Sequence, residues 1–484
     1  MTGRPALDAV VIGAGPNGLA AAITLARAGR SVQVVEAADV IGGGTRTQEL
    51  TLPGFRHDVC STIVPLTLAS PFLRTIDWAA RGVELVHPDA PMAHALAPDR
   101  AVVLERSMAA LTRSLRDAGG PHAEHDARAW RRLFGRLARE VDRLTGEILG
   151  PVVHLPRHPL TLARFGLPAL LPAAMLARSR FRGEPARALF AGMAAHAMVP
   201  LTSPLTASFG LVLGTCAHAV GWPMVRGGSQ ALADALGAEL RALGGEIVAG
   251  TRVTDLAELP PSRVVIANVT PPALVALAGE RMPAGTRSRL GRYRFGPGVF
   301  KVDWALDGPI PWTADGLRRA ATIHLGGGLD HLVASEAAPA AGRHADRPFT
   351  LLVQYHPWDP TRAPDGRTTA WAYCHVPNGS TVDMTGAIEA QVERFAPGFR
   401  DRILARAVHG PAALEAHDPN YVGGDINAGL SDARQVIFRP TPSLDPYHVG
   451  PGLYLGSSST PPGGGVHGMS GHLAARSALR RELR

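Results

Sequence analysis

The chain has 484 residues, of which 46% are hydrophobic, and a formal net charge of +8. One hydrophobic core rarely supports this length, so we expect more than one structural unit. The positive charge comes from scattered arginines without a run of five basic residues, which argues against nucleic-acid binding. Cys60, Cys216 and Cys374 lie far apart without CxxC spacing, so neither a disulfide framework nor a zinc or other metal site is expected.

The first element is a buried-strand pattern, LDAVVI, which leads through GAGPNG into the helical pattern LAAAITLARAG. This order of strand, GxGxxG and helix brings the backbone close to a pyrophosphate at the helix N-terminus. A second strand pattern, SVQVVEAA, ends at Glu36, where an acidic side chain would bind the ribose hydroxyls of a dinucleotide. No signal-peptide pattern precedes the first strand, so we expect a cytoplasmic protein. The candidate pyrophosphate-binding residues are Gly13, Gly15, Pro16, Asn17 and Gly18.

The segment after Glu36 reads VIGGGTRTQELTLPGFRHDVCS. Gly42 and Gly43 would bring a second backbone turn against the dinucleotide, and Arg46 would add a cation. This segment resembles the glycine-doublet signature of the flavin amine oxidase and phytoene desaturase superfamily, and GFRHDVCS resembles the superfamily's G-x-x-x-D stretch. The resemblance implies that the cofactor is FAD rather than NAD.

The C-terminal segment GLYLGSSSTPPGGGVHGMSGHLAARSAL predicts a strand ending at Gly456, a glycine-rich loop and a helix from about Gly468. It resembles the final motif of bacterial-type phytoene desaturases and of the pyridine nucleotide-disulfide oxidoreductase domain-containing protein 2 group. The resemblance implies cofactor contacts here, with a helix N-terminus that stabilises negative charge on the flavin pyrimidine. His467 either exchanges protons with substrate or flavin, or is a histidine with satisfied hydrogen bonds. The implied cofactor-binding residues are Gly456, Ser457, Gly468 and Met469.

Residues 226–256 predict a turn, an amphipathic helix and a strand pair, and SRVVIANVTPPAL predicts another buried strand. In the resembled family this region completes the FAD domain and places Val253 near the adenine. The predicted fold is therefore α/β, with a Rossmann-type FAD-binding domain in three sequence pieces and a substrate domain that has a β-sheet and a helical cap. The expected boundaries are 1–75, 215–275 and 430–484 for the FAD pieces, 76–214 for the helical cap and 276–429 for the β-rich region.

The most apolar long stretch, Leu160 to Met175, is interrupted by prolines, glycine and arginine. It is too short and too interrupted to span a bilayer. Because several arginines follow, it could enter a membrane surface. The alternative is an ordinary helical hairpin packed on the body of the protein.

Lys301, in PGVFKVDWAL, is the single lysine among 49 lysine and arginine residues. Strand alternation places Lys301 and Asp303 on one face. One interpretation is an ion pair between them on a solvated face. The other comes from the resemblance, because flavin amine oxidases carry a strand lysine that holds a water against flavin N5.

Residues 420–440 resemble the segment that lines the pocket in this family. Asp425 is a candidate for positioning substrate or taking a proton, and a turn-capping aspartate is the alternative. Tyr373 and His375 alternate onto one strand face and either reach the same cavity or pack in the core.

These features predict an FAD-dependent oxidoreductase that removes hydride and proton from a largely apolar substrate to leave a double bond, with hydride passing to flavin N5. The alternatives are an amine or amino-acid oxidase that gives an imine, and a non-redox flavin-dependent isomerase or scaffold. The expected partners are an apolar small molecule and an electron acceptor, either oxygen, a quinone or another carrier, without nucleic acid. Peripheral membrane contact and a homodimer both stay open.

Overall fold

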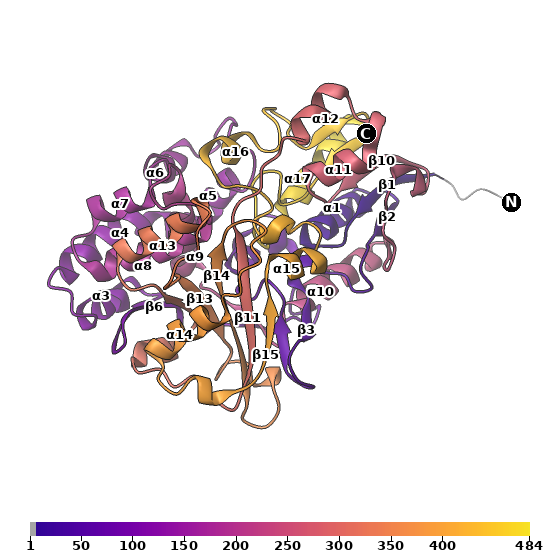
Figure 1. Ribbon diagram of the computed structural model, residues 1–484. Helices are drawn as coiled ribbons and strands as arrows, with labels where there is room; N and C mark the ends of the chain where they lie inside the picture. Colours follow the sequence, from indigo (N-terminus) through magenta and orange to yellow (C-terminus); the bar gives the residue numbers. More distant parts are fainter. Residues whose placement is uncertain (1–5) are drawn as a thin grey trace.

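A computed structural model describes residues 6–484, and residues 1–5, at the start of the predicted first FAD piece, lie outside the described part. Three layers are visible in Figure 1. A Rossmann-type domain with the C-terminus lies at the upper right, a second sheet fills the centre, and a group of helices lies at the left. The predicted α/β fold class is confirmed, because parallel strands with flanking helices stand beside a largely antiparallel sheet.

The sheet of the Rossmann-type domain has the strand order β16-β17-β10-β1-β2-β9. β1 lies in the interior of this sheet and pairs in parallel with both β10 and β2, which explains its apolar run from Ala9 to Ile12. Helices α1, α10 and α17 pack around this sheet. The strands are β1 (Leu7–Ile12), β2 (Val32–Val35), β9 (Glu246–Val248), β10 (Ser262–Ala267), β16 (His448–Gly450) and β17 (Leu453–Leu455). The helices are α1 (Pro16–Arg27), α10 (Gln230–Ala242) and α17 (Met469–Arg481).

The second sheet has the strand order β15-β11-β14-β13-β12-β6-β7. Its apolar face packs against α14 (Thr385–Phe395) through a fully buried core that includes Trp304. The opposite face carries Lys301, Asp303, Trp371 and Tyr373, because successive strand residues alternate. The strands are β6 (Ala90–Ala97), β7 (Arg100–Leu104), β11 (Gly298–Leu306), β12 (Ala320–Leu325), β13 (Thr350–Gln354), β14 (Thr368–Val376) and β15 (Ile403–His409).

The structure differs from the predicted helical region 76–214 in its first part. β6 pairs in parallel with β12, and β7 pairs with β6, so residues 90–104 belong to the second sheet. β6 is buried on both faces and therefore lacks the polar alternation that marks a half-buried strand. The helical layer begins at residue 108 instead. It contains α3 (Met108–Asp117), α4 (Ala123–Arg139), α5 (Val141–Ile148), α6 (Pro159–Ala169), α7 (Ala173–Arg180), α8 (Glu184–Ala194) and α9 (Thr206–Ala219).

The helical layer packs around buried aromatic side chains, among them Trp130, Phe134 and Phe190. Among the described residues no single helix is long and apolar enough to cross a membrane, whereas α6 and α7 meet that test together as a pair bent by 99°. The remaining helices and short strands connect the layers. They are α2 (Pro65–Ala69), α11 (Pro271–Ala278), α12 (Ala284–Leu290), α13 (Leu329–Ala340), α15 (Pro411–His417), α16 (Ala433–Phe438), β3 (Thr47–Glu49), β4 (Arg56–Asp58), β5 (Leu85–Val86) and β8 (Met224–Val225).

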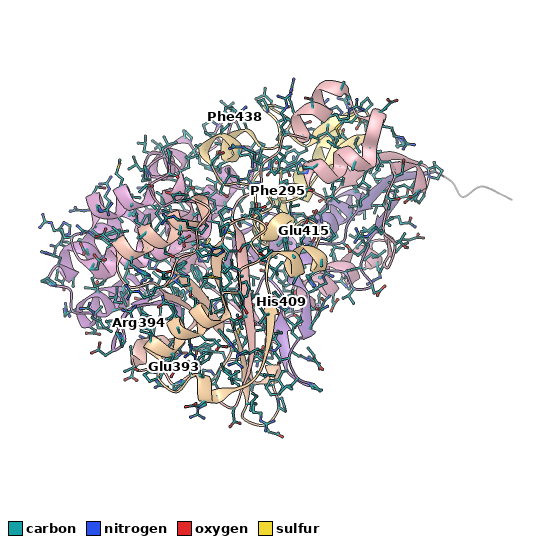
Figure 2. The ribbon with its side chains drawn as sticks, in the orientation of Figure 1. Phe295, Glu393, Arg394, His409, Glu415 and Phe438 are labelled. Carbon is teal, nitrogen blue, oxygen red and sulfur yellow. The ribbon has the colours of Figure 1, made fainter. Side chains whose placement is uncertain are left out.

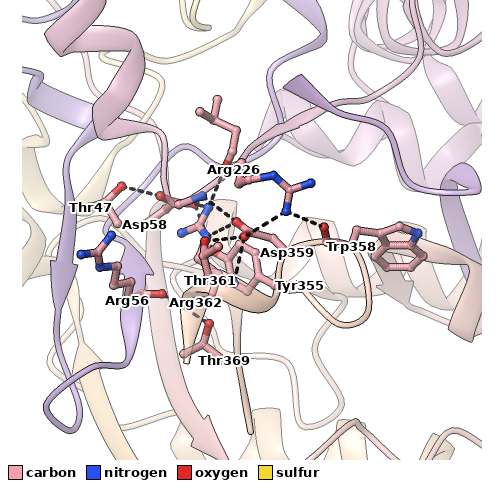
Figure 3. A network of polar contacts seen from close by, with 12 residues as sticks. Thr47, Arg56, Asp58, Arg226, Tyr355, Trp358, Asp359, Thr361, Arg362 and Thr369 are labelled. Atoms are coloured by element: carbon pink, nitrogen blue, oxygen red, sulfur yellow. Dashed lines mark hydrogen bonds and ion pairs between the residues drawn. The ribbon is translucent and has the colours of Figure 1, made fainter. Parts of the chain in front are cut away.

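A buried ion pair joins the N-terminal segment to the second sheet (Figure 3). Asp58 and Arg362 are both 0% exposed, and their carboxylate and guanidinium groups lie 3.0 Å apart. Asp58 also accepts hydrogen bonds from the Thr47 hydroxyl, the Ser229 amide and the Tyr355 hydroxyl. Burial opposes ionisation, but Arg362 and these donors outweigh it and hold the pKa of Asp58 below its usual value. The aspartate of the GFRHD stretch is therefore a structural connection between the two units.

Candidate functional site

One cavity of about 570 Å³ lies where the Rossmann-type domain, the second sheet and the helical layer meet. Its wall includes Gly15 and Gly43 from the glycine turns, Trp371 from β14, and Phe165 and Phe209 from the helices. A polar end at the glycine turns is thus continuous with an apolar end between α6 and α9.

The turn between β1 and α1 forms one wall of the polar end. Gly13 has a φ of +90°, and a Cβ on Gly18 would lie 1.9 Å from the Gly13 carbonyl oxygen, so neither position has room for a side chain. Asn17 lines the cavity in the first turn of α1, and its buried Oδ1 has no hydrogen-bond partner among residues 6–484. A helix N-terminus with open backbone contacts fits a bound pyrophosphate. The cavity-lining residues of this turn are Gly15, Pro16 and Asn17.

The second glycine turn is held directly against the first. The Gly42 amide donates to the Ala14 carbonyl at 3.0 Å, and a Cβ on Gly43 would lie 3.3 Å from the Gly15 Cα. The Glu36 carboxylate accepts the Ala14 amide at 2.6 Å and the Ala38 amide at 2.9 Å. Glu36 is therefore fixed at the end of β2, where its position fits ribose binding.

Val253 is partly buried and packs against a core that contains Leu256. In the described part of the chain it lies outside the cavity wall. Its predicted contact with the adenine stays a prediction.

Arg46 does not supply the predicted cation to the cavity. Its guanidinium donates to the Gly43 carbonyl at 3.0 Å and to the His417 carbonyl at 2.7 Å, so it braces the backbone from outside the described cavity wall. The buried cation that lines the cavity is Arg439, which donates to the Ser458 carbonyl at 3.4 Å. Sequence reasoning missed Arg439, although it lies within the segment 420–440 that was assigned to the pocket.

The C-terminal loop divides between cavity contacts and helix packing. Ser457 and His467 line the cavity. Gly456 and Gly468 instead allow α17 to approach its neighbours, because a Cβ on Gly456 would lie 3.1 Å from the Ala474 Cβ, and one on Gly468 would lie 2.9 Å from the Ala20 Cβ. Of the implied cofactor residues in this loop, only Ser457 reaches the described cavity wall. Met469 lies outside that wall and is largely buried.

Both ring nitrogens of His467 have hydrogen-bond partners in the backbone, as expected for a histidine with satisfied hydrogen bonds rather than one that exchanges protons. Its Nδ1 accepts the Met469 amide at 3.0 Å, and its Nε2 donates to the Gly463 carbonyl at 3.1 Å. Burial lowers the pKa of His467 to about 4. Protonation at Nδ1 would break the bond to Met469, so these contacts hold the neutral imidazole in place.

Lys301 forms the ion pair with Asp303, but on a buried face rather than the predicted solvated one. The ammonium lies 2.5 Å from Oδ1 of Asp303, and both side chains are almost fully buried. His57 and His409 contact the same carboxylate, at 3.4 and 3.5 Å, and Figure 2 labels His409 beside β15. Burial opposes ionisation, yet Lys301 and the two imidazoles hold the pKa of Asp303 well below its usual value.

Trp371 lies next to this ion pair and also lines the cavity. The Lys301 ammonium is 5.1 Å from the centre of a Trp371 ring, and Trp371 lines the cavity. Thr62 and Tyr355 both accept the indole N–H, which fixes the ring. The predicted contact of Lys301 with flavin N5 stays a prediction, with the ammonium located directly behind the cavity wall.

Asp425 is a turn-capping residue in the structure. Its carboxylate accepts the backbone amides of Gly296, Asn427 and Gly429 at 2.7 to 2.9 Å. The cavity-lining carboxylate of this region is Asp418, which accepts the Asn420 amide at 3.0 Å. Burial raises the pKa of Asp418. Sequence reasoning missed Asp418, because its place at the cavity depends on α15 lying against the glycine turns.

Tyr373 and His375 share the predicted strand face but have different surroundings. Tyr373 lines the cavity, and its ring stacks against that of Trp371 at 5.8 Å with an angle of 11°. His375 pairs with the buried carboxylate of Glu336 at 2.6 Å, as the core-packing alternative expected.

Comparison with known proteins agrees with this geometry. Residues 11–75 match the NAD(P)-binding Rossmann-like domain family. Over 99% of its length the chain is 28% identical to pyridine nucleotide-disulfide oxidoreductase domain-containing protein 2 of Mus musculus, covering 94% of that protein. An oxidoreductase structure from Methanosarcina mazei shares the fold with a TM-score of 0.65 and 17% identity, covering 98% of this chain and 100% of the other.

Putrescine oxidase bound to putrescine also shares the fold, with a TM-score of 0.60, 18% identity and 99% of each chain covered. The full-length match is the relationship that the motifs at the two ends of the chain predicted. The chain is therefore similar over nearly its full length to the pyridine nucleotide-disulfide oxidoreductase domain-containing protein 2 of Mus musculus, and it shares its fold with putrescine oxidase.

Proposed function

We propose that the chain binds FAD and removes hydride and proton from a largely apolar substrate, which leaves a double bond. Asn17 with its open Oδ1, the paired glycine turns, Glu36 and Ser457 are the residues that would hold the dinucleotide. FAD, when bound, supplies a hydride acceptor at N5. The chain's own residues bind the substrate, orient it and exclude water.

The apolar end of the cavity is the observation that carries this proposal. It is continuous with the glycine turns, so a substrate there would lie next to the cofactor. Burial of apolar surface contributes about 25 cal/mol per Å² to binding, which favours a hydrocarbon skeleton. The lining side chains of this end include Leu162, Phe165, Leu205, Phe209, Val212 and Leu213.

The two carboxylates of the cavity wall are poorly placed to receive an ammonium group. Glu147 already accepts hydrogen bonds from His154, His158 and the Arg157 amide. Asp418 lies at the glycine turns, away from the apolar end. These contacts favour an uncharged substrate over an amine.

Anaerobic mixing of the purified holoprotein with polyenes, acyl compounds and amines tests the reaction. We expect apolar, unsaturated or acyl compounds to bleach the flavin absorbance. Leu162→Asp should leave FAD bound and slow bleaching at least about tenfold, because a carboxylate in the cavity wall would lose hydration on contact with an apolar ligand. Leu160→Asp is the matched control, because Leu160 is on the same helix but 70% exposed and outside the described cavity wall.

The other outcomes distinguish the remaining functions. Bleaching by amines alone would point to an amine oxidase. A bound flavin that no candidate bleaches would point to an isomerase or scaffold. Protein that purifies colourless and takes up no FAD would contradict the proposed cofactor.

We further propose that the rim of the cavity contacts an anionic membrane surface. Leu155, Leu167 and Leu170 are 91%, 72% and 57% exposed, and Leu170 also lines the cavity. Across the cavity, α16 contributes Phe438, which lies at the outer edge of the molecule in Figure 2. Arg157 and Arg180 supply positive charge that anionic headgroups attract, whereas the nearby Arg164 and Arg178 are paired with Glu140 and Asp330.

Co-sedimentation with anionic vesicles tests this contact. We expect binding at low salt, and at least about a fivefold loss of binding in Leu155→Ser/Leu167→Ser, because each leucine buries apolar area in the interface. Val408→Ser is the control, because Val408 is also exposed but belongs to β15, which lies away from α6 in Figure 1. Absence of binding to anionic vesicles at low salt would contradict the contact.

A further inference from the structure

The wall of the cavity on β12 contains a buried hydroxyl without a partner. Thr322 is 2% exposed, and its Oγ1 has no hydrogen-bond partner within residues 6–484. Three other hydroxyls share this condition in the described chain, those of Thr215, Ser229 and Thr385, and of the four only Thr322 lines the cavity. A buried hydroxyl without a partner costs free energy, so this atom is a site for a ligand group.

His196 also lines the cavity, next to the strand that carries Thr322. It follows α8, and its Nε2 lies 3.3 Å from Nε2 of His324, which is two residues after Thr322 on the same strand face. A hydrogen bond between these two nitrogens contains one proton, so one imidazole ring is the donor and the other is the acceptor. Nδ1 of His196 lies outside this contact.

Both imidazoles are neutral at ordinary pH. Burial lowers the pKa of His196 to about 3 and lowers the pKa of His324 well below its usual value. The neighbouring side chains of the wall, among them Met198, Leu351 and Val353, are apolar. The nearby carboxylate, Glu336, is already paired with His375.

A charged ligand group at this end would therefore lose its hydration without gaining a counter-charge. An uncharged group that can both accept and donate hydrogen bonds would match Thr322 and His196. A hydroxyl group has this chemistry, and a carbonyl group matches the donors of the pair, because its oxygen can accept the Thr322 O–H or an imidazole N–H.

On the basis of the function proposed above, we propose that Thr322 and His196 form a subsite for an uncharged oxygen-bearing group, a hydroxyl or carbonyl, on the apolar substrate. The subsite makes Thr322 a specificity-determining residue. It orients the skeleton within the cavity, so that one end is held at the second sheet and the remainder extends along the apolar wall.

Headspace partitioning of 1-octanol and octane over the holoprotein measures binding without turnover. We expect Thr322→Val to weaken 1-octanol binding about fivefold and to leave octane binding within about twofold, because valine keeps the shape and removes the hydrogen bond. Thr322→Ser should restore 1-octanol binding. Competition against deuterated 1-octanol measures the preference for an uncharged group. Octanoate and octylammonium should each displace the deuterated 1-octanol at least about tenfold less well than unlabelled 1-octanol does.

Thr215→Val is the matched control, because it removes another buried hydroxyl without a partner in the described chain, on α9 and outside the cavity wall. It should change neither ligand's binding. The subsite is overturned if Thr322→Val leaves 1-octanol binding unchanged, if it weakens octane binding equally, or if the wild-type protein binds neither ligand. A Thr322-dependent preference for 1-octanol in a protein whose flavin no compound bleaches would support the subsite while contradicting the proposed reaction.

Discussion

Replacement of Asp58 by asparagine is expected to lower the free energy of unfolding by about 3 kcal/mol, because a buried ion pair loses one partner. Four donors converge on the Asp58 carboxylate, from Thr47, Ser229, Tyr355 and Arg362. An asparagine amide would turn its own N–H donors toward some of them. In the variant, the Arg362 guanidinium keeps its ion pair with the Asp359 carboxylate, at 2.8 Å in the wild type. The expected loss of stability is therefore at the lower end of the range for breaking a buried ion pair. Urea-induced unfolding measures the change.

The difference in free energy of unfolding between wild type and Asp58→Asn depends on pH, and the folded-state pKa of Asp58 determines the direction of that dependence. The folded-state pKa of Asp58 lies below its ordinary value of 3.8, so the ion pair stabilises the fold above that pH and loses its contribution as pH falls through the folded pKa. The gap between wild type and Asp58→Asn should therefore narrow below about pH 4. Asp330→Asn is the control, because its ion pair with Arg178 is exposed and is worth at most about 1 kcal/mol. A gap that stays constant to pH 2 would contradict the role of the carboxylate charge.

Replacement of Lys301 by methionine is expected to lower the free energy of unfolding by about 3–5 kcal/mol, again because a buried charge loses its partner. Asp303 is 0% exposed, and in the variant only the imidazoles of His57 and His409 would remain near it. Methionine has a similar length, so packing against Trp371 changes little. Thermal and urea unfolding of the holoprotein measure the effect.

The double variant Lys301→Met/Asp303→Leu separates charge from packing. It should regain most of the lost stability, because both buried charges are removed together. If Lys301→Met instead unfolds like the wild type but reduces its flavin, or reoxidises it with oxygen, more slowly, the ammonium acts on the cofactor and the structural role is wrong.

Strand alternation in the second sheet could be predicted from the sequence, because the period of two is a local property of the backbone. It correctly placed Lys301 with Asp303, and Tyr373 with His375. Burial of that face could not be predicted, because it depends on β4, which is far away in the sequence and whose His57 lies 3.4 Å from Asp303. The ion pair was therefore assigned to solvent, whereas it is buried beside Trp371.

The glycine turns of the site could be predicted from the sequence, whereas the roles of its charged and titratable side chains could not. The turns need particular backbone angles, so their glycines can be recognised in the sequence. Arg46, His467 and Asp425 have suitable chemistry, but their hydrogen bonds to backbone groups are decided by tertiary structure. Thr322 and His196 carried no local signal, because they reach the same cavity wall only in the folded chain, where His196 lies 3.3 Å from His324 on the strand that carries Thr322.

The interleaved sheet of the Rossmann-type domain has a consequence for how the protein is made. β1 needs β10, β10 needs β17, and α17 packs on α1, so residues near both ends of the chain are neighbours in space. Contacts of such long sequence separation form slowly, because the loops between them must close first. During synthesis on the ribosome, Asn17 gains its contact with Ser458, and α1 its packing against α17, only after residues 453–481 have emerged, so the Rossmann-type domain completes its fold late.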